Sequence, residues 1–199
     1  IIGILISTFC LVVSRFYKNI YGRQGYLTMT LPVNSHQLIL SKLSAALIWY
    51  FIATLVILLS GFIIAGITLS QQIPSMSFLL NQASNQINFL MGQHFVVLAL
   101  SLISILIDTV MGILLSYFAI SLGQLFRDHR ILLAVAFYVG LYFAVSVFQF
   151  FTNFAAVNNS INAEISLIPN PILMATNLLL TIGFYFGTHF IMTKKLNLQ

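Results

Sequence analysis

Apolar residues occur in five long runs that are separated by polar segments. The runs lie at about 1–16, 43–69, 95–120, 131–152 and 172–192. A membrane-spanning helix needs about 20 mostly apolar residues to cross a hydrocarbon core of roughly 30 Å. The runs fit this length, although the first is cut short by the start of the chain. The pattern therefore predicts an all-α, polytopic membrane protein with five transmembrane helices in a single domain.

The composition supports a membrane protein over a soluble one. Of the 199 residues, 60% are hydrophobic and only 6% are charged, whereas a soluble domain has about 25% charged residues. A large buried core does not explain these numbers, because too little polar surface would remain to keep the protein dissolved. The single cysteine, Cys10, lies in an apolar run, and we expect it to be a small buried residue.

The basic residues predict the orientation in the membrane. They flank or fill the first connection, lie in the third, or follow the last run: Arg15, Lys18, Arg23, Lys42, Arg127, Arg130, Lys194 and Lys195. The second and fourth connections contain no Lys or Arg. Alternate connections share one side of a membrane, and the positive-inside rule makes the basic side cytoplasmic. We therefore expect a multi-pass protein of the cell membrane with a cytoplasmic C-terminus. An absent upstream helix would complete a six-helix unit.

The connection at 17–42 is too long for a tight hairpin and too apolar for a free cytoplasmic loop. Pro32 interrupts any helix there, and Asn34 or Ser35 can cap the next one. Several apolar side chains precede this break, namely Tyr26, Leu27, Met29 and Leu31. The pattern predicts a short cytoplasmic helix whose apolar side chains dock into a groove on another protein.

Two stretches resemble a known transporter family. The segment GYLTMTLPVNSHQLILSKL, at 25–43, resembles the connection between the second and third helices of ABC-2 type permeases, especially those of Gram-positive bacteria. The segment YFAISLGQLFRDHRIL, at 117–132, resembles the connection between their fourth and fifth helices.

The resemblance implies a six-helix permease with the ABCG-like fold, paired with a second, identical or different, permease subunit. Cytoplasmic ABC ATPase subunits would grip the coupling helix at 24–31. The resemblance places Gln24, Tyr26, Leu27, Met29 and Leu31 at the ATPase contact. The charged segment at 127–130 could suggest a catalytic cluster, but a cytoplasmic turn fits it better, and we expect Arg127 and Asp128 to contact the ATPase as well. The implied function is the export of an amphipathic substrate, such as an antimicrobial peptide, a drug or a lipid.

The chain lacks the residue patterns of an enzyme. It contains no G-x-x-x-x-G-K-[ST] phosphate loop, so we expect ATP and Mg²⁺ to bind the partner ATPase. Its four histidines show no metal-ligand spacing, and no H-E-x-x-H motif occurs, so we expect no metal, no catalytic residue and no bound cofactor. The net charge of +5 lies at helix ends, where it favours contact with anionic lipid over nucleic acid.

Asp108 is the only acidic residue deep within an apolar run. A carboxylate at this depth costs about 2.5–3.5 kcal/mol on insertion scales, so it normally faces protein or water. Ser101, Ser104 and Met111 fall near the same helical face. One interpretation is a polar strip that lines the translocation path or senses a proton. The other is an aspartic acid, protonated or not, that hydrogen-bonds to a neighbouring helix.

Small residues mark possible helix contacts. Gly183 and Gly187 form a GxxxG pair in the last run, and Gly61 and Ala65 form a similar pair in the second. Such pairs let helices approach closely, either within one subunit or between two.

Other functions fit the sequence less well. A non-enzymatic membrane sensor or assembly subunit is the main alternative. A secondary transporter would be expected to show inverted repeats and several intramembrane charges, and an intramembrane enzyme would need a catalytic cluster.

Overall fold

The computed structural model describes residues 2–21, 35–70, 81, 84–85, 95–126, 129–159 and 170–195. In chain order its long elements are α1 (Ile2–Ile20), α3 (Ser35–Ser70), α5 (Phe95–Gly123), α6 (Arg130–Asn159), α7 (Pro171–Phe190) and the π-helix η1 (Ile191–Lys195). These described ranges contain helices and no β-strand, so the predicted all-α class is confirmed for this part of the chain.

Four of the helices, α3, α5, α6 and α7, are long and apolar enough to cross a membrane. Large apolar side chains remain exposed along them; Phe62 on α3, for example, is 74% exposed, and Phe143 on α6 is 69% exposed. Surfaces of this kind are stable only against lipid or another protein. The chain is therefore a multi-pass helical membrane protein. α1 is not among the four, and its last two turns carry Arg15 and Lys18.

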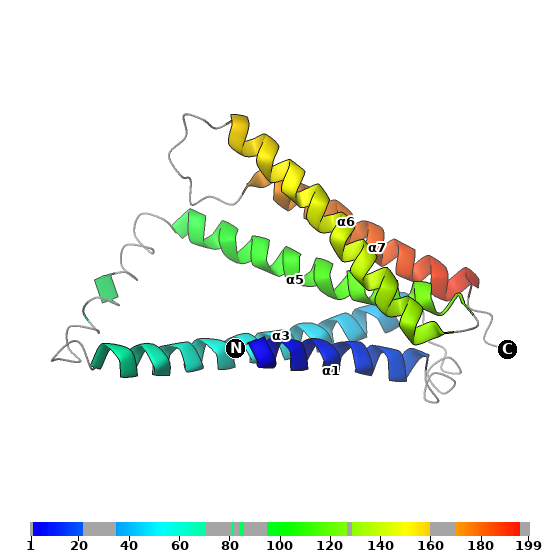
Figure 1. Ribbon diagram of the computed structural model, residues 1–199, viewed down its shortest axis with the longest axis horizontal. Helices are drawn as coiled ribbons and strands as arrows, with labels where there is room; N and C mark the ends of the chain where they lie inside the picture. The colour runs from blue at the N-terminus through cyan, green and yellow to red at the C-terminus, as the bar shows by residue number, and fades with distance from the viewer. Residues whose placement is uncertain are drawn as a thin grey trace.

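Successive helices run in opposite directions, as Figure 1 shows. α1, α5 and α7 end on the right of this view, where α3 and α6 begin. Arg15, Lys18, Lys42 and Arg130 all lie within about two turns of these helix ends. We call this the basic end of the molecule, and the other the opposite end.

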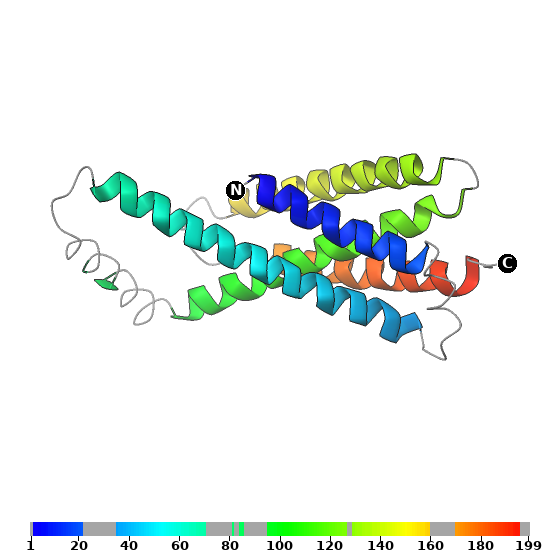
Figure 2. The same ribbon diagram turned by 90° about the horizontal axis from the view of Figure 1, so that it is seen from below.

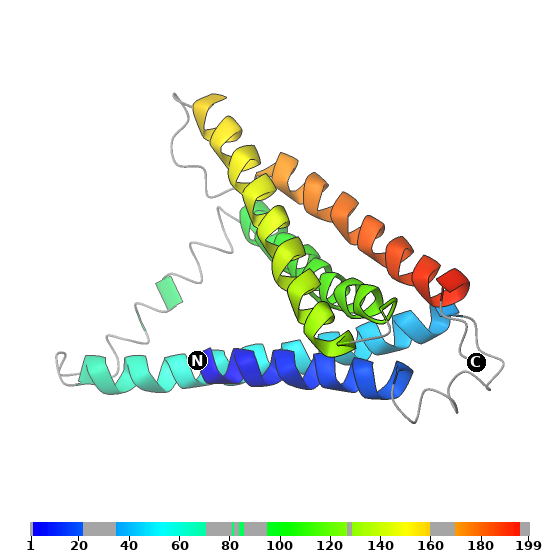
Figure 3. The ribbon, with the colours of Figure 1, turned by 45° about the vertical axis from the view of Figure 1, so that its right-hand side comes forward.

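The helices form two layers, with α1 and α3 in one and α5, α6 and α7 in the other. Figures 1 and 3 show the layers together at the basic end and diverging towards the opposite end. α5 is the central helix, because it packs against each of the other four. Seen from below in Figure 2, α3 crosses α5 instead of running parallel to it. The second half of α3 consequently leaves the bundle.

The core lies near the basic end. Buried side chains are concentrated in the second half of α5, from Met111 to Gly123. Phe16 of α1 and Ile39 of α3 pack into the same core and are almost fully buried. The first half of α5, by contrast, carries exposed apolar residues such as Ile103 and Leu106. The bundle is thus closely packed at the basic end and open at the other.

Several helices extend beyond the apolar runs from which they were predicted. α3 begins at Ser35 and has 36 residues, a length of about 54 Å, so it projects beyond the hydrocarbon core. α6 continues past residue 152 to Asn159, and within it Thr152 and Asn153 donate side-chain hydrogen bonds to the carbonyl of Gln149 in the preceding turn.

The start of α7 has a well-formed cap. The Asn170 side chain accepts a hydrogen bond of 3.0 Å from the backbone N–H of Ile172, and Pro171 occupies the first helical position.

Candidate functional site

A polar contact joins three helices inside the membrane region. The Asn177 side chain of α7 donates a hydrogen bond of 2.7 Å to Asp108 of α5. Gln149 of α6 donates a hydrogen bond of 2.9 Å to the Asn177 carbonyl oxygen. Asp108 is close to the middle of α5, roughly 20 Å from either end. The contact therefore lies at hydrocarbon depth, where polar side chains are rare and usually functional.

The three side chains differ in how far they are covered by protein. Asn177 is only 2% exposed, whereas Gln149 is partly buried and Asp108 is exposed. In the part of the chain that the structure describes, the second carboxylate oxygen of Asp108 accepts no hydrogen bond, and no Lys or Arg pairs with it. Within the described residues, the aspartate is thus held by Asn177 through one oxygen, and its side chain remains exposed.

Ser101 and Ser104 follow Asp108 along one face of α5 towards the opposite end. On an ideal helix they lie within about 40° of Asp108. Both are partly exposed, while Met111 and Leu115, on the same face towards the basic end, are buried. Asp108 therefore lies at the boundary between the packed and the open part of the bundle.

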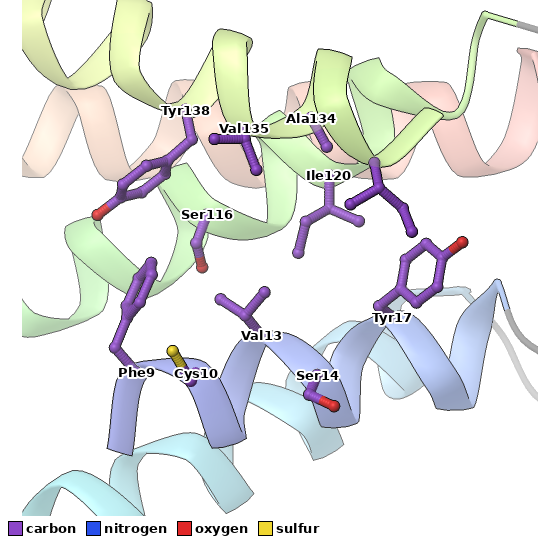
Figure 4. Close-up of a pocket in the computed structure, with 11 residues that line it drawn as sticks. Phe9, Cys10, Val13, Ser14, Tyr17, Ser116, Ile120, Ala134, Val135 and Tyr138 are labelled. Carbon is purple, nitrogen blue, oxygen red and sulfur yellow. The ribbon is translucent and has the colours of Figure 1, made fainter. Parts of the chain in front are cut away.

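A cavity of about 380 Å³ lies between α1, α5 and α6 near the basic end. Figure 4 shows Phe9 and Val13 of α1 on one side and Val135 and Tyr138 of α6 on the other, with Ser116 of α5 between them. Its lining is almost wholly apolar, and its volume is in the range of small-molecule sites. This apolar crevice could hold the hydrocarbon part of an amphipathic molecule.

A second, more open cavity of about 670 Å³ adjoins the crevice, because Tyr17, Ile131 and Val135 line both. His129 and Arg130 also line it, at the start of α6. The apolar crevice therefore opens towards polar and basic side chains at the basic end.

Aromatic and hydroxyl groups fasten α1 and α3 to α5 at the basic end. The rings of Phe16 and Tyr117 stack with their centroids 3.7 Å apart. The Tyr21 hydroxyl hydrogen-bonds to the Ser121 hydroxyl at 2.8 Å, and the Tyr117 hydroxyl donates to the Lys42 carbonyl at 3.2 Å. Burial raises the pKa of Tyr21 to about 12, although its hydrogen bond with Ser121 acts in the opposite direction. We call these residues the basic-end clamp.

The residues predicted to contact an ATPase lie outside the described residues. They are Gln24, Tyr26, Leu27, Met29, Leu31, Arg127 and Asp128. The structure does place the clamp beside this connection, since Tyr21 directly precedes the interval between α1 and α3.

The glycines predicted to mediate helix packing have different surroundings. A Cβ atom at Gly187 would lie 2.6 Å from the ring of Phe118, so this glycine allows α7 to approach α5. Within the described part of the chain, a Cβ atom at Gly183 or Gly61 would meet no atom within 4 Å. A closer contact occurs at Gly123, where a Cβ atom would lie 2.8 Å from the backbone of Ala134.

Sequence reasoning missed Asn177 and Gln149. Each is a polar residue within an apolar run, which was the signal available. It also missed that His36 and His189 stack, with ring centroids 3.8 Å apart, and that His36 hydrogen-bonds to Tyr185 at 2.8 Å. The prediction that Cys10 is buried was wrong, because it is exposed and lines the apolar crevice. In a membrane helix an apolar position can face lipid as readily as protein.

Comparisons with protein-family models, with curated proteins and with solved structures found no match to this chain.

Proposed function

We propose that this chain is the membrane-spanning permease subunit of an exporter that is driven by a separate ABC ATPase in the cell membrane. The ATPase would dock on residues 24–31, with Arg127 and Asp128 nearby. The two sequence stretches at 25–43 and 117–132, which resemble ABC-2 permeases, support this assignment.

The observation that carries the proposal is the basic-end clamp. Phe16 and Tyr21 tie the end of α1 to α5, and the Tyr117 hydroxyl ties the start of α3 to the same helix. Residues 22–34 connect these two fastened helices. A force applied to that connection would reach the central helix through direct contacts, as ATP-driven transport requires.

The surroundings of the apolar crevice support an amphipathic cargo. The crevice provides an apolar lining for a hydrocarbon part, and His129 and Arg130 lie beside its opening. Most of the binding free energy of such a cargo would come from apolar surface removed from water or headgroups.

The docking of an ATPase can be tested by purifying the full chain from its native host in a mild detergent. Residues 24–31 would be replaced by a Gly-Ser segment of equal length, and a matched control would replace 160–167, between α6 and α7. We expect the wild type and the control to retain a protein that contains a phosphate loop and hydrolyses ATP. The 24–31 variant should lose it.

The two variants separate docking from general damage. Loss of the ATPase from both would point to misfolding, which size-exclusion chromatography of each variant would reveal. Retention of the ATPase by a monodisperse 24–31 variant would contradict the proposal and favour a sensor or assembly subunit.

A further inference from the structure

The face of α5 that carries Ser101, Ser104 and Asp108 offers only hydrogen-bond acceptors. The Ser101 hydroxyl donates its proton to the Leu98 carbonyl, and the Ser104 hydroxyl donates to the Ser101 carbonyl, each at 2.8 Å. Only the lone pairs of these two oxygens remain available. An ionised carboxylate is likewise an acceptor alone. The strip therefore matches a group that donates hydrogen bonds or carries positive charge.

The side-chain amides of Gln149 and Asn177 form a hydrogen-bonded chain that ends on Asp108. Gln149 donates to Asn177, and Asn177 donates to Asp108, so both donors point towards the carboxylate. Hydrogen bonds aligned in this way polarise one another and strengthen the last one in the chain. One carboxylate oxygen of Asp108 is therefore held by the protein.

Among the residues that the structure describes, no basic side chain lies against Asp108. Asp108 itself is exposed. The basic side chains that the structure describes lie near the basic end, whereas Asp108 is roughly 20 Å from it. Ionisable residues at this depth commonly pair with another group or mark a substrate pathway, and the exposed side of Asp108 leaves room for a cationic partner.

We propose that Asp108 binds the positively charged group of the transported molecule, with Asn177 and Gln149 as its positioning residues. The cargo is then a cationic amphiphile. This inference rests on the proposed function in so far as the bound molecule is a cargo, but binding itself requires no ATPase.

The binding can be measured on the purified full chain in nanodiscs of a neutral lipid. The probes are tetraphenylphosphonium, a lipophilic cation, and tetraphenylborate, an anion of nearly the same size and shape. The wild type should bind the cation saturably and in preference to the anion. Asp108→Asn keeps the shape and can still accept a hydrogen bond from Asn177, but it should weaken cation binding by at least about tenfold. Its affinity for the anion should not fall.

Two further variants keep the test decisive. Asp108→Glu retains the charge and should preserve the preference for the cation, even if the longer side chain loses the contact with Asn177. Thr109→Val is the matched control, because the Thr109 hydroxyl donates only to the Ile105 carbonyl of its own helix. It should bind the cation as the wild type does.

Equal cation affinity in the wild type and in Asp108→Asn would overturn the inference, and so would a wild type that does not prefer the cation. The outcome is independent of the ATPase test. Loss of cation binding in Asp108→Asn supports a cation site even if no ATPase associates with the chain. Retained ATPase association leaves the permease assignment intact even if Asp108 binds no cation.

Discussion

The side-chain amide of Asn177 hydrogen-bonds to two other helices at once. Its nitrogen donates to Asp108 of α5 and its oxygen accepts from Gln149 of α6, while the residue itself is almost completely buried on α7. An interhelical hydrogen bond in a membrane contributes on average only about 0.6 kcal/mol, and at most about 1.7 kcal/mol. Two such bonds are therefore a modest source of stability, and their main effect is to fix the orientation of three helices.

Replacing Asn177 by leucine should lower the free energy of unfolding by about 1 kcal/mol, because both interhelical bonds are lost. Asn153→Leu is the matched control, since among the described residues the Asn153 side chain bonds only to the Gln149 carbonyl of its own helix. Unfolding of each variant in detergent, titrated with sodium dodecyl sulfate, would measure the difference. Equal free energies of unfolding for the two variants would show that the hydrogen bonds between the three helices do not stabilise the protein.

At the scale of elements, α5 organises the bundle through close approaches at its basic end. Gly123 brings the end of α5 against the backbone of Ala134 in α6, and Gly187 brings α7 against Phe118. Helices in lipid associate through such packing because lipid chains are as apolar as the side chains they replace. The glycines are therefore important only where another helix is actually present, which is not the case for Gly183 in the described part of the chain.

Gly123→Ala should destabilise the protein by about 1–3 kcal/mol, because the new methyl group would overlap backbone atoms that cannot rotate away. Gly112→Ala lies in the same helix, and its Cβ would meet no described atom within 4 Å. This control should be neutral or stabilising by up to about 1 kcal/mol, since alanine favours a helix more than glycine does. Thermal unfolding in detergent would compare them. If the two substitutions shift the midpoint temperature of unfolding equally, the close approach of α5 and α6 does not contribute to stability.

At the scale of the whole molecule, the two layers meet at the basic end and separate towards the opposite end (Figures 1 and 3). The alternating helix directions gather Arg15, Lys42 and Arg130 at one end. Basic residues are retained on the cytoplasmic side during insertion. The packed end, with the clamp and the connection at 22–34, should therefore face the cytoplasm.

Cysteine labelling in intact cells tests this orientation. In a Cys10→Ser background, a cysteine at Ser84, between α3 and α5, should react with a membrane-impermeant maleimide. A cysteine at Leu125, between α5 and α6, should react only after the membrane is permeabilised. Both native side chains are exposed, so burial would not mask either site. The reverse labelling pattern would place the basic end outside and remove the surface on which an ATPase is proposed to dock.

The sequence by itself determined the membrane class, the helical runs and the alternation of connections with and without basic residues. These follow from the total apolarity of each segment, which does not depend on its neighbours. It also singled out Asp108, because an ionisable residue is conspicuous in an apolar run. The partners of Asp108 were not predictable in the same way. Helices such as α3 are apolar around their circumference, so no apolar stripe marks the face that meets protein.

Only the tertiary structure decided which faces of the helices pack against one another. It brought Asn177 to Asp108 across a separation of 69 residues along the chain, and Gln149 to Asn177 across a separation of 28 residues. It also distinguished Gly187 and Gly123, which lie against other helices, from Gly183, which meets no described atom within 4 Å. In lipid, an outward apolar side chain is as stable as an inward one, so shape and a few polar contacts select the packing. Those contacts join residues far apart in the sequence, and they become visible only when the helices are placed together.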